Sequence, residues 1–327
     1  MKYDVITIGS AAQDVYLFSK KFKVIRDKRA ITGESECFAF GTKIELDHIL
    51  FEVGGGATNT ANTFKRQGLK VACLGRIGND GAGEEVKKFL KTTGIGDLLI
   101  VDKKDRTAQS VIFLAPNGER TILVYRGAAH HFKTSDVNLQ KIKNTKWLYI
   151  SSLAGNTQLL EKIVLFARKN KIKVAVNPGK LEIAKQNSLR RIVRHIDLLF
   201  VNREEAITLL RSTKNDDRSL LQNLRKLCPG LVVMTKGTGG SVAVLAGVQY
   251  RVIIKPVRAL DTTGAGDSFG SGLLSGLIKY RGDIKKALFL AAQNSASDVL
   301  HIGAKHGALW KNTELKNFHC QIRTQKV

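Results

Sequence analysis

The residues best suited to chemistry in this chain lie in the run LDTTGAGDSFGSGLL, where Asp267 directly follows Gly264, Ala265 and Gly266. The stretch 268–280 is mostly small or apolar and contains no proline, so it predicts a buried helix that begins at this turn. Unpaired N–H groups and the helix dipole at such an N-terminus attract an anion, and small residues let the anion approach the backbone. The run therefore predicts a cradle for a phosphoryl group or an oxyanion. Asp267 would accept a proton from an attacking hydroxyl.

Two other interpretations fit the same letters. Asp267 could simply cap the helix. Alternatively, GDSFG matches the GxSxG pattern of serine hydrolases, with Ser268 as nucleophile and with Asp298 and His301 in the right chain order. The hydrolase is the weaker alternative, because ALDTTGA does not read as a strand that enters the first glycine. The chain also contains neither GxxxxGK[ST] nor an intact GxGxxG, the usual nucleotide-binding patterns.

Apolar, strand-like runs alternate with amphipathic segments along most of the chain, as in DVITIG, TNTANTFKRQG and VACLGRIG. This alternation predicts an α/β fold with a parallel sheet covered by helices on both faces. Two segments, Val15–Phe51 and Thr107–Arg126, contain strand-like pieces without helices between them. They predict antiparallel strands in a separate small sheet that covers a cleft as a lid, with a hairpin turn at PNG, residues 116–118.

Composition narrows the classes of function. The 327 residues suffice for one large or two small α/β domains, and no apolar run approaches the roughly 20 residues of a membrane span. The four cysteines are far apart and the N-terminus shows no signal-peptide pattern, so we expect reduced thiols in the cytoplasm. The formal charge is +25. No nucleic-acid motif accompanies this charge, so we expect a basic enzyme surface rather than a nucleic-acid partner. A homodimer remains an open expectation.

Five short motifs together resemble the ribokinase-like (PfkB) carbohydrate kinase family. DTTGAGDSF resembles its C-terminal signature, and GGGATNTANTFKRQGLKVACLGRIGNDGAG resembles its N-terminal one. NPG, NREE and TKGTGGS lie between them in the family's order. The resemblance spans almost the whole chain. It implies one kinase domain over residues 1–327, with a three-layer ribokinase-like fold, a mostly parallel central sheet and a small β-sheet lid. It also implies transfer of the γ-phosphoryl group of ATP to a hydroxyl of a sugar.

The resemblance implies roles for the residues of the opening run. Asp267 matches the family's general base, and Gly264, Ala265 and Gly266 match the anion hole that holds the γ-phosphoryl group. Asp261 and Thr263 match a loop that binds a monovalent cation such as K⁺ in many members. An Asx-turn that opens the loop is an equally open interpretation of Asp261.

The acceptor is expected to bind near the N-terminal motifs. Asp14 resembles the aspartate that accepts hydrogen bonds from sugar hydroxyls, and it follows a strand at the sheet end where α/β folds bind ligands. Gly54 and Gly55 would let the backbone approach the acceptor, and Asn59 would bond a hydroxyl. Alternatively, Asp14 is a solvated acid in a loop, Gly54 and Gly55 only form a tight turn, and Asn59 caps a helix N-terminus.

The nucleotide is expected near the later motifs. The resemblance assigns Asn202 and Glu205 to ordering Mg²⁺-bound water around the triphosphate. Asn294 would lie near the adenine, unless it is an ordinary buried helix residue. The nucleotide loop would contribute Thr235, Gly237 and Gly240.

One departure from the family pattern bears on the acceptor. After Gly54 and Gly55 the chain reads Gly-Ala-Thr, where typical ribokinases read Lys-Gly-Ala. Ribose itself is therefore in doubt, and the long lid segment leaves a nucleoside as the main alternative acceptor. A phosphorylated sugar is a third possibility.

Overall fold

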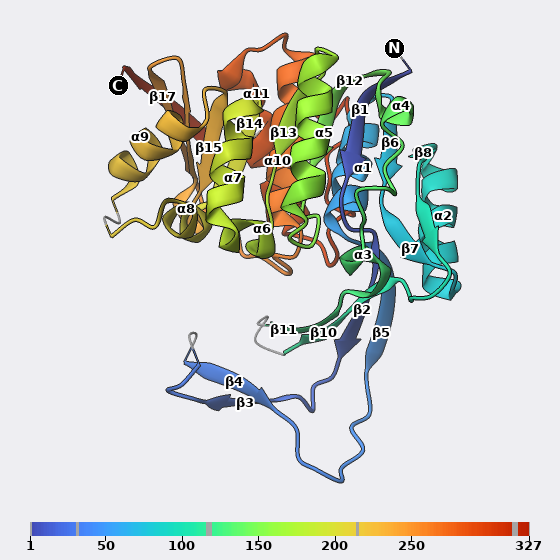
Figure 1. Ribbon diagram of the computed structural model, residues 1–327. Coiled ribbons are helices and arrows are strands. Elements are labelled where there is room, and N and C mark those ends of the chain that lie inside the picture. The colour runs from blue at the N-terminus through green and yellow to red at the C-terminus, as the bar shows by residue number, and fades with distance from the viewer. Residues whose placement is uncertain (1, 31–32, 116–119, 214–215, 316–319, 327) are drawn as a thin grey trace.

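A large sheet between two layers of helices forms the body of the molecule (Figure 1). The computed structural model describes residues 2–30, 33–115, 120–213, 216–315 and 320–326. Within this part of the chain the sheet has ten strands in the order β18-β17-β16-β15-β14-β13-β12-β1-β6-β8. The parallel strands are β1 (Tyr3–Ile8), β6 (Val71–Leu74), β8 (Gly96–Asp97), β12 (Thr145–Ile150), β13 (Lys173–Val176), β14 (Leu198–Asn202) and β15 (Leu231–Thr235). The antiparallel strands at one edge are β16 (Ser241–Leu245), β17 (Val248–Ile254) and β18 (Cys320–Lys326).

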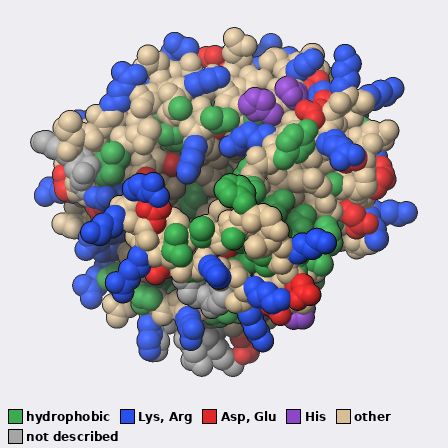
Figure 2. Space-filling model, turned by 90° about the horizontal axis from the view of Figure 1, so that it is seen from below, with side chains coloured by type: hydrophobic (Ala, Val, Ile, Leu, Met, Phe, Trp, Pro, Cys, Tyr) green, Lys and Arg blue, Asp and Glu red, His purple; other side chains and the backbone are tan. Residues whose placement is uncertain are grey.

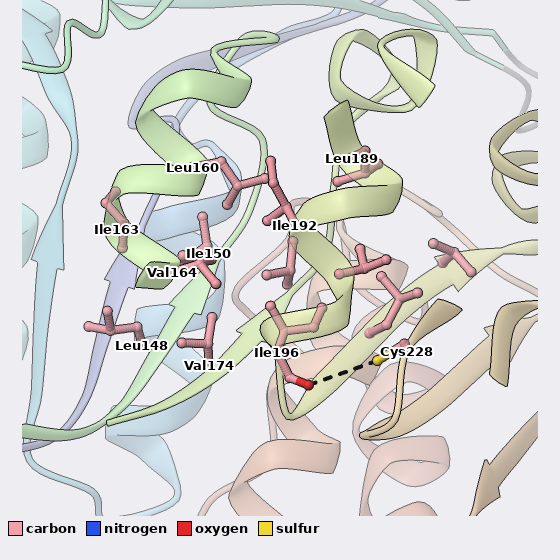
Figure 3. Close-up of a cluster of buried hydrophobic side chains, with 14 of the residues drawn as sticks. Leu148, Ile150, Leu160, Ile163, Val164, Val174, Leu189, Ile192, Ile196 and Cys228 are labelled. Carbon is pink, nitrogen blue, oxygen red and sulfur yellow. Dashed lines mark hydrogen bonds between the residues drawn. The ribbon is translucent and has the colours of Figure 1, made fainter. Parts of the chain in front are cut away.

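Helices bury both faces of this sheet, which explains why its central strands are continuously apolar. One face is covered by α1 (Gly56–Arg66), α10 (Ala265–Lys279) and α11 (Ile284–Asp298). The other face is covered by α5 (Thr157–Lys169), α6 (Lys180–Ala184), α7 (Gln186–Ile192), α8 (Arg203–Leu210) and α9 (Asp217–Leu227). Figure 3 shows part of this second core, where Ile150 of β12 and Leu160 of α5 are both buried. The Cys228 thiol donates to the carbonyl of Ile196 in the same region.

The remaining elements lie around the end of the body that carries β8 and around the loops. They are β7 (Arg76–Gly78), α2 (Gly81–Thr93), β9 (Ile100–Asp102), α3 (Gly127–His130), α4 (Leu139–Ile142) and the 3₁₀ turns Val193–His195 and Gly237–Gly239. The three-layer architecture with a mostly parallel sheet agrees with the prediction from the sequence.

A separate four-stranded sheet extends from one end of the body (Figure 1). We call it the small sheet. Its strands, in spatial order, are β11 (Arg120–Tyr125), β10 (Ala108–Leu114), β2 (Ala12–Phe18) and β5 (His48–Gly54). Beyond it, β3 (Lys23–Arg26) and β4 (Glu34–Cys37) form a hairpin.

The two segments without helices thus form one small sheet, as predicted, but the prediction that its strands are all antiparallel was wrong. β2 and β10 pair in parallel, with Ala12 opposite Ala108. Both strands begin with a buried alanine against the body and run outward, so they share a direction. The PNG turn predicted at 116–118 lies outside the described residues.

The structure bears on two predictions from composition. All four cysteines are free. Among the described residues, none of the helices combines the length and the apolar character needed to cross a membrane.

Candidate active site

The N-terminus of α10 is built around Gly264. This residue is the N-cap and has a φ of 79°, in the left-handed region. A Cβ at this position would lie 2.2 Å from the Cβ of Ala304, so both the backbone conformation and the space require glycine. The Ser268 N–H already donates to the Gly264 carbonyl, at 2.8 Å. The N–H groups of Gly266 and Asp267 lie in the first turn, where the helix itself offers no acceptor. The geometry of this turn is therefore compatible with the predicted anion site, which stays a prediction.

The Asp267 carboxylate meets helix α1 across the core. Its Oδ2 accepts a hydrogen bond of 3.0 Å from Nδ2 of Asn59. Burial raises the pKa of Asp267, while the Asn59 hydrogen bond and the nearby Lys305 charge act in the opposite direction. A raised pKa brings a carboxylate closer to the operating pH of a general base.

The Asn59 amide is engaged on both sides. Its oxygen accepts from the ammonium of Lys305, which is buried. The structure therefore places Asn59 between Lys305 and Asp267. The sequence reasoning missed Lys305, because nothing in its local pattern distinguishes it among 53 lysines and arginines.

A cavity of about 260 Å³ begins at the N-terminus of α10 and reaches the loop after β15. Ala265 and Gly266 line one end of it. Its walls include apolar side chains such as Phe269 and Val299. The loop contributes the three residues predicted for the nucleotide, Thr235, Gly237 and Gly240. The structure thus brings the predicted nucleotide loop and the predicted anion hole to one cavity with polar groups at one end and apolar walls.

Asn202 and Glu205 form a reciprocal capping box at the start of α8. The Glu205 N–H donates to Oδ1 of Asn202 at 2.8 Å, and the Asn202 N–H donates to Oε2 of Glu205 at 2.9 Å. Burial raises the pKa of Glu205. Asn202 lies opposite Thr235 in the β14–β15 register, so the pair is next to the nucleotide loop. Among the described residues no three His, Cys, Asp or Glu side chains group as metal ligands.

Asp261 fixes the loop before α10. Its Oδ1 accepts from the Thr263 N–H at 2.8 Å, and its Oδ2 accepts from the Gly303 N–H at 3.1 Å. The first of these bonds is the Asx-turn considered from the sequence. The Thr263 hydroxyl is buried without a partner, and Nε of Arg120, on β11 of the small sheet, lies 3.9 Å from Oδ1 of Asp261. The loop therefore keeps one oxygen that could take a further ligand.

Asp14 lies on the face of the small sheet that is turned to the body, and it is only 6% exposed. It sits between Glu52 of β5 and Ser110 of β10 in the strand register. Burial raises the pKa of Asp14, and the Ser110 hydrogen bond and Lys305 lower it. A Cβ on Gly54 would lie 2.1 Å from Oδ2 of Asp14, so glycine is what leaves room for the carboxylate.

A second cavity, of about 140 Å³, opens between the small sheet and the body. Its lining includes Gly55, which is the N-cap of α1 with a φ of 94°. Ala12, Ser110 and Tyr125 of the small sheet also line it. Figure 2 looks at the molecule from this side, where the surface is hollowed and Lys and Arg side chains lie around its edge.

The structure separates Asn294 from the nucleotide cavity. Its side chain is fully buried, its Nδ2 donates to the Ser268 carbonyl and its Oδ1 accepts from the Leu309 N–H, each at 2.8 Å. Asn294 therefore joins α11 to α10 and to the following loop, which is the buried-residue alternative. Its neighbours Ala292 and Ser295 line the cavity instead.

The structure does not show the arrangement that a serine hydrolase needs around Ser268. GDSFG lies inside α10, not at a strand-to-helix turn. The Ser268 hydroxyl donates directly to Oδ2 of the buried Asp298, at 2.6 Å. His301 is exposed and bonds to the carbonyl of Ser297 through Nδ1, so no histidine stands between the serine and the acid.

Comparison with known proteins gives a consistent result. A model of the pfkB family of carbohydrate kinases matches residues 3–311. A nucleoside kinase of Methanothermobacter thermautotrophicus is 27% identical over 69% of this chain and 72% of its own length. An ATP-dependent 6-phosphofructokinase of Thermoanaerobacterium thermosaccharolyticum is 26% identical over 93% of this chain and 90% of its own. The ribokinase of Giardia lamblia has the same fold, with a TM-score of 0.77 at 22% identity, covering 94% of this chain and 97% of that one.

Proposed function

Because the chain belongs to the pfkB family of carbohydrate kinases, and so is a phosphotransferase, we propose that it transfers the γ-phosphoryl group of ATP to a hydroxyl of a sugar. Asp267 acts as the general base. The observation that carries this proposal is the position of Asp267, which stands at an anion-binding helix N-terminus with its carboxylate oriented by Asn59.

The transfer needs three contributions from the chain. Asp267 takes the proton of the acceptor hydroxyl as that oxygen attacks the γ-phosphorus, while the bond from this phosphorus to the β–γ bridging oxygen breaks and ADP leaves with the electron pair. The Gly264–Gly266 turn then holds the phosphoryl oxygens with backbone N–H groups, which are already aimed at the position where negative charge builds. The apolar cavity beside the turn excludes water from the adenosine side of the nucleotide, with Thr235, Gly237 and Gly240 forming its far wall.

Two ions belong to this proposal. Mg²⁺ would neutralise the triphosphate, and Glu205 would hold one of its water molecules beside Asn202. K⁺ would bind next to Asp261, where the unpartnered Thr263 hydroxyl supplies an oxygen. Because the two hydrogen bonds of Asp261 already fix this loop, we expect K⁺ to tighten the anion hole rather than to take part in the chemistry.

The acceptor binds on the other side of Asp267, under the small sheet. Asp14 accepts hydrogen bonds from its hydroxyls, and the backbone at Gly54 and Gly55 lets it approach α1. The small sheet acts as a lid, since it carries Asp14 and lines the second cavity. A closed lid excludes water and strengthens those hydrogen bonds.

A nucleoside is the second candidate acceptor, and the residues that line the second cavity favour it. Small residues such as Ala12 and Ala129 leave room there, and Tyr125 offers an aromatic ring. Such a lining suits a planar base attached to the sugar. An ATP-consumption screen of ribose, fructose 6-phosphate and adenosine, with Mg²⁺ and K⁺ present, distinguishes these acceptor classes. No turnover with any of them would contradict the proposal.

The variant Asp267→Asn tests the chemistry. It keeps the shape and removes the base, so we expect turnover to fall by roughly 10²–10⁴ with little change in nucleotide affinity. Ser268→Ala is the matched control one residue along. It should cost stability, because Asp298 loses its hydrogen bond, but turnover should change little. An active Asp267→Asn beside an inactive, folded Ser268→Ala would favour the hydrolase instead.

A further inference from the structure

Lys305 has an unusual environment for a lysine in this basic chain. It is 5% exposed and is the only buried lysine or arginine in the part of the chain that the structure describes. It lies in the loop after α11, and its ammonium donates to two acceptors, the Val53 carbonyl of β5 and Oδ1 of Asn59. Its Nζ also lies 5.4 Å from the ring centroid of Phe89. Burying an ammonium costs free energy, so this arrangement calls for a reason beyond packing.

The hydrogen bonds give Asn59 a direction. An ammonium has donors and no acceptor, so it can face only the oxygen of the amide. The amide nitrogen must then point the other way, where it donates to Oδ2 of Asp267 at 3.0 Å. Lys305 thus prevents Asn59 from turning its oxygen toward Asp267, an orientation in which two acceptors would oppose each other.

The ammonium is also the positive charge among four acids, of which Asp14 and Asp298 are buried and Glu52 and Asp267 are partly buried. The carboxylates of Asp14, Glu52, Asp267 and Asp298 face it from β2, β5, α10 and α11. The neighbouring His306 pairs with Glu52, at 2.8 Å between Nε2 and Oε1. Burial lowers the pKa of Lys305 to about 8, against the raising effect of these acids. The ammonium in turn acts to lower the pKa values of Asp14 and Asp267, so its charge favours their ionised forms.

The same loop holds the small sheet to α1. Nδ2 of Asn62 on α1 donates to the Lys305 carbonyl at 3.1 Å, while the Lys305 ammonium reaches Val53 near the end of β5. One side chain therefore contacts the sheet that carries Asp14 and the helix that orients Asp267.

We propose that Lys305 is a positioning residue for phosphoryl transfer, which holds the Asn59 amide in the orientation that supports an ionised Asp267. This inference rests on the proposed function, because it assigns Lys305 to the base of that reaction. The ammonium form is the active one, since only a charged group can hold the amide and balance the carboxylates together.

The pH dependence of kcat/KM for the acceptor tests this inference, using the acceptor turned over in the screen and a range from about pH 5.5 to about pH 9.5. With the pKa of Lys305 near 8, the intact protein should lose activity as the pH rises through that value. Lys305→Met should lack this alkaline decline. Its acid limb should move to higher pH, because Asp267 without the cation takes up a proton more readily. On the acid limb, where activity follows the ionised fraction of Asp267, kcat/KM should fall by about tenfold for each unit by which that pKa rises.

Lys91→Met is the control for loss of a positive charge, because Lys91 is exposed on α2. Its profile should match that of the unchanged protein. If the pH profile of Lys305→Met has the same shape as that of the unchanged protein, with every rate reduced by the same factor, the role of Lys305 is structural and the inference is wrong. The unchanged protein gives a test that needs no variant, since a rate that stays level to about pH 9.5 also overturns it. If either result overturns the role of Lys305 while Asp267→Asn is inactive, the proposal that Asp267 is the general base still stands. The two proposals can therefore fail separately.

Discussion

Gly54→Ala offers a sharp test of the acceptor site, because it moves Asp14 without altering its chemistry. A Cβ at Gly54 would lie 2.1 Å from Oδ2 and 2.3 Å from Cγ of Asp14. Such contacts must open by about 1 Å, and a displacement of that size in a site can cost about 10²-fold in rate. The Asp14 side chain is short and buried, so it cannot give way without losing its place.

The expected rise in the acceptor KM follows from the loss of one hydrogen bond between Asp14 and an acceptor hydroxyl. A hydrogen bond to a charged group is worth roughly 1.5–3 kcal/mol. Since each 1.4 kcal/mol is a factor of ten, the KM of the acceptor should rise by about ten- to a hundredfold. The proposed nucleotide site is the other cavity, so the KM of the nucleotide should hardly change.

Initial rates measured with each substrate varied in turn separate the two constants. Gly81→Ala is the control, because a Cβ there meets nothing within 4 Å. Asp14→Ala should show the same raised acceptor KM, and the double variant should be no worse than Asp14→Ala, since both changes remove one interaction. An unchanged acceptor KM in a folded Gly54→Ala would refute the placement of the acceptor beside Asp14. Equal increases in both KM values would make Asp14 structural.

Two further variants test the surroundings of the base. Gly264→Ala forces a side chain into the left-handed region and against Ala304, so kcat should fall about tenfold or more, with a loss of roughly 1–3 kcal/mol in unfolding free energy; a folded variant with unchanged kcat would count against the anion hole. Burial raises the pKa of Asp298 from the ordinary value of 3.8 to about 6. The protonated carboxyl therefore stabilises the fold fully below pH 3.8, and this contribution is lost as the pH rises through 6. Asp298→Asn should therefore gain up to about 3 kcal/mol over the unchanged protein between about pH 4 and about pH 8 in urea unfolding, and parallel pH curves for the two proteins would contradict this.

The parts of the site that the sequence predicted are those made by neighbours in the chain. Gly264, Asp267 and the predicted helix after them lie within a few residues, so a local rule about helix N-termini was enough to predict an anion site. The loop from Thr235 to Gly240 was assigned to the nucleotide by its resemblance to a family motif, which is also a short run of neighbouring residues. Both reach the same cavity in the structure, because β15 and β17 run in the same direction and end at the same edge of the sheet.

The parts that the sequence did not predict depend on contacts between distant residues. Asn59 and Asp267 are 208 positions apart, and Lys305 and Asn59 are 246 apart, so no local pattern marks either bond. Asn294 reads equally well as a ligand or as a buried helix residue, and only the packing of α11 against α10 decides between them. The parallel pairing of β2 with β10 likewise depends on where each strand leaves the body.

Under the proposed function, the distribution of charge would separate the positions of the two substrates. At the small-sheet end, Asp14 and Glu52 offer acceptor oxygens, which suit hydroxyl groups and repel phosphates. At the other end, the first turn of α10 offers N–H donors, which suit phosphates. Asp267 stands between the two ends, and Lys305 balances the acids behind it. The net charge of +25 lies mainly on the surface, where it draws an anionic nucleotide toward the molecule. Under the proposed function, the carboxylates of Asp14 and Glu52 would repel its phosphates from the acceptor side, so we expect the two substrates to meet at Asp267.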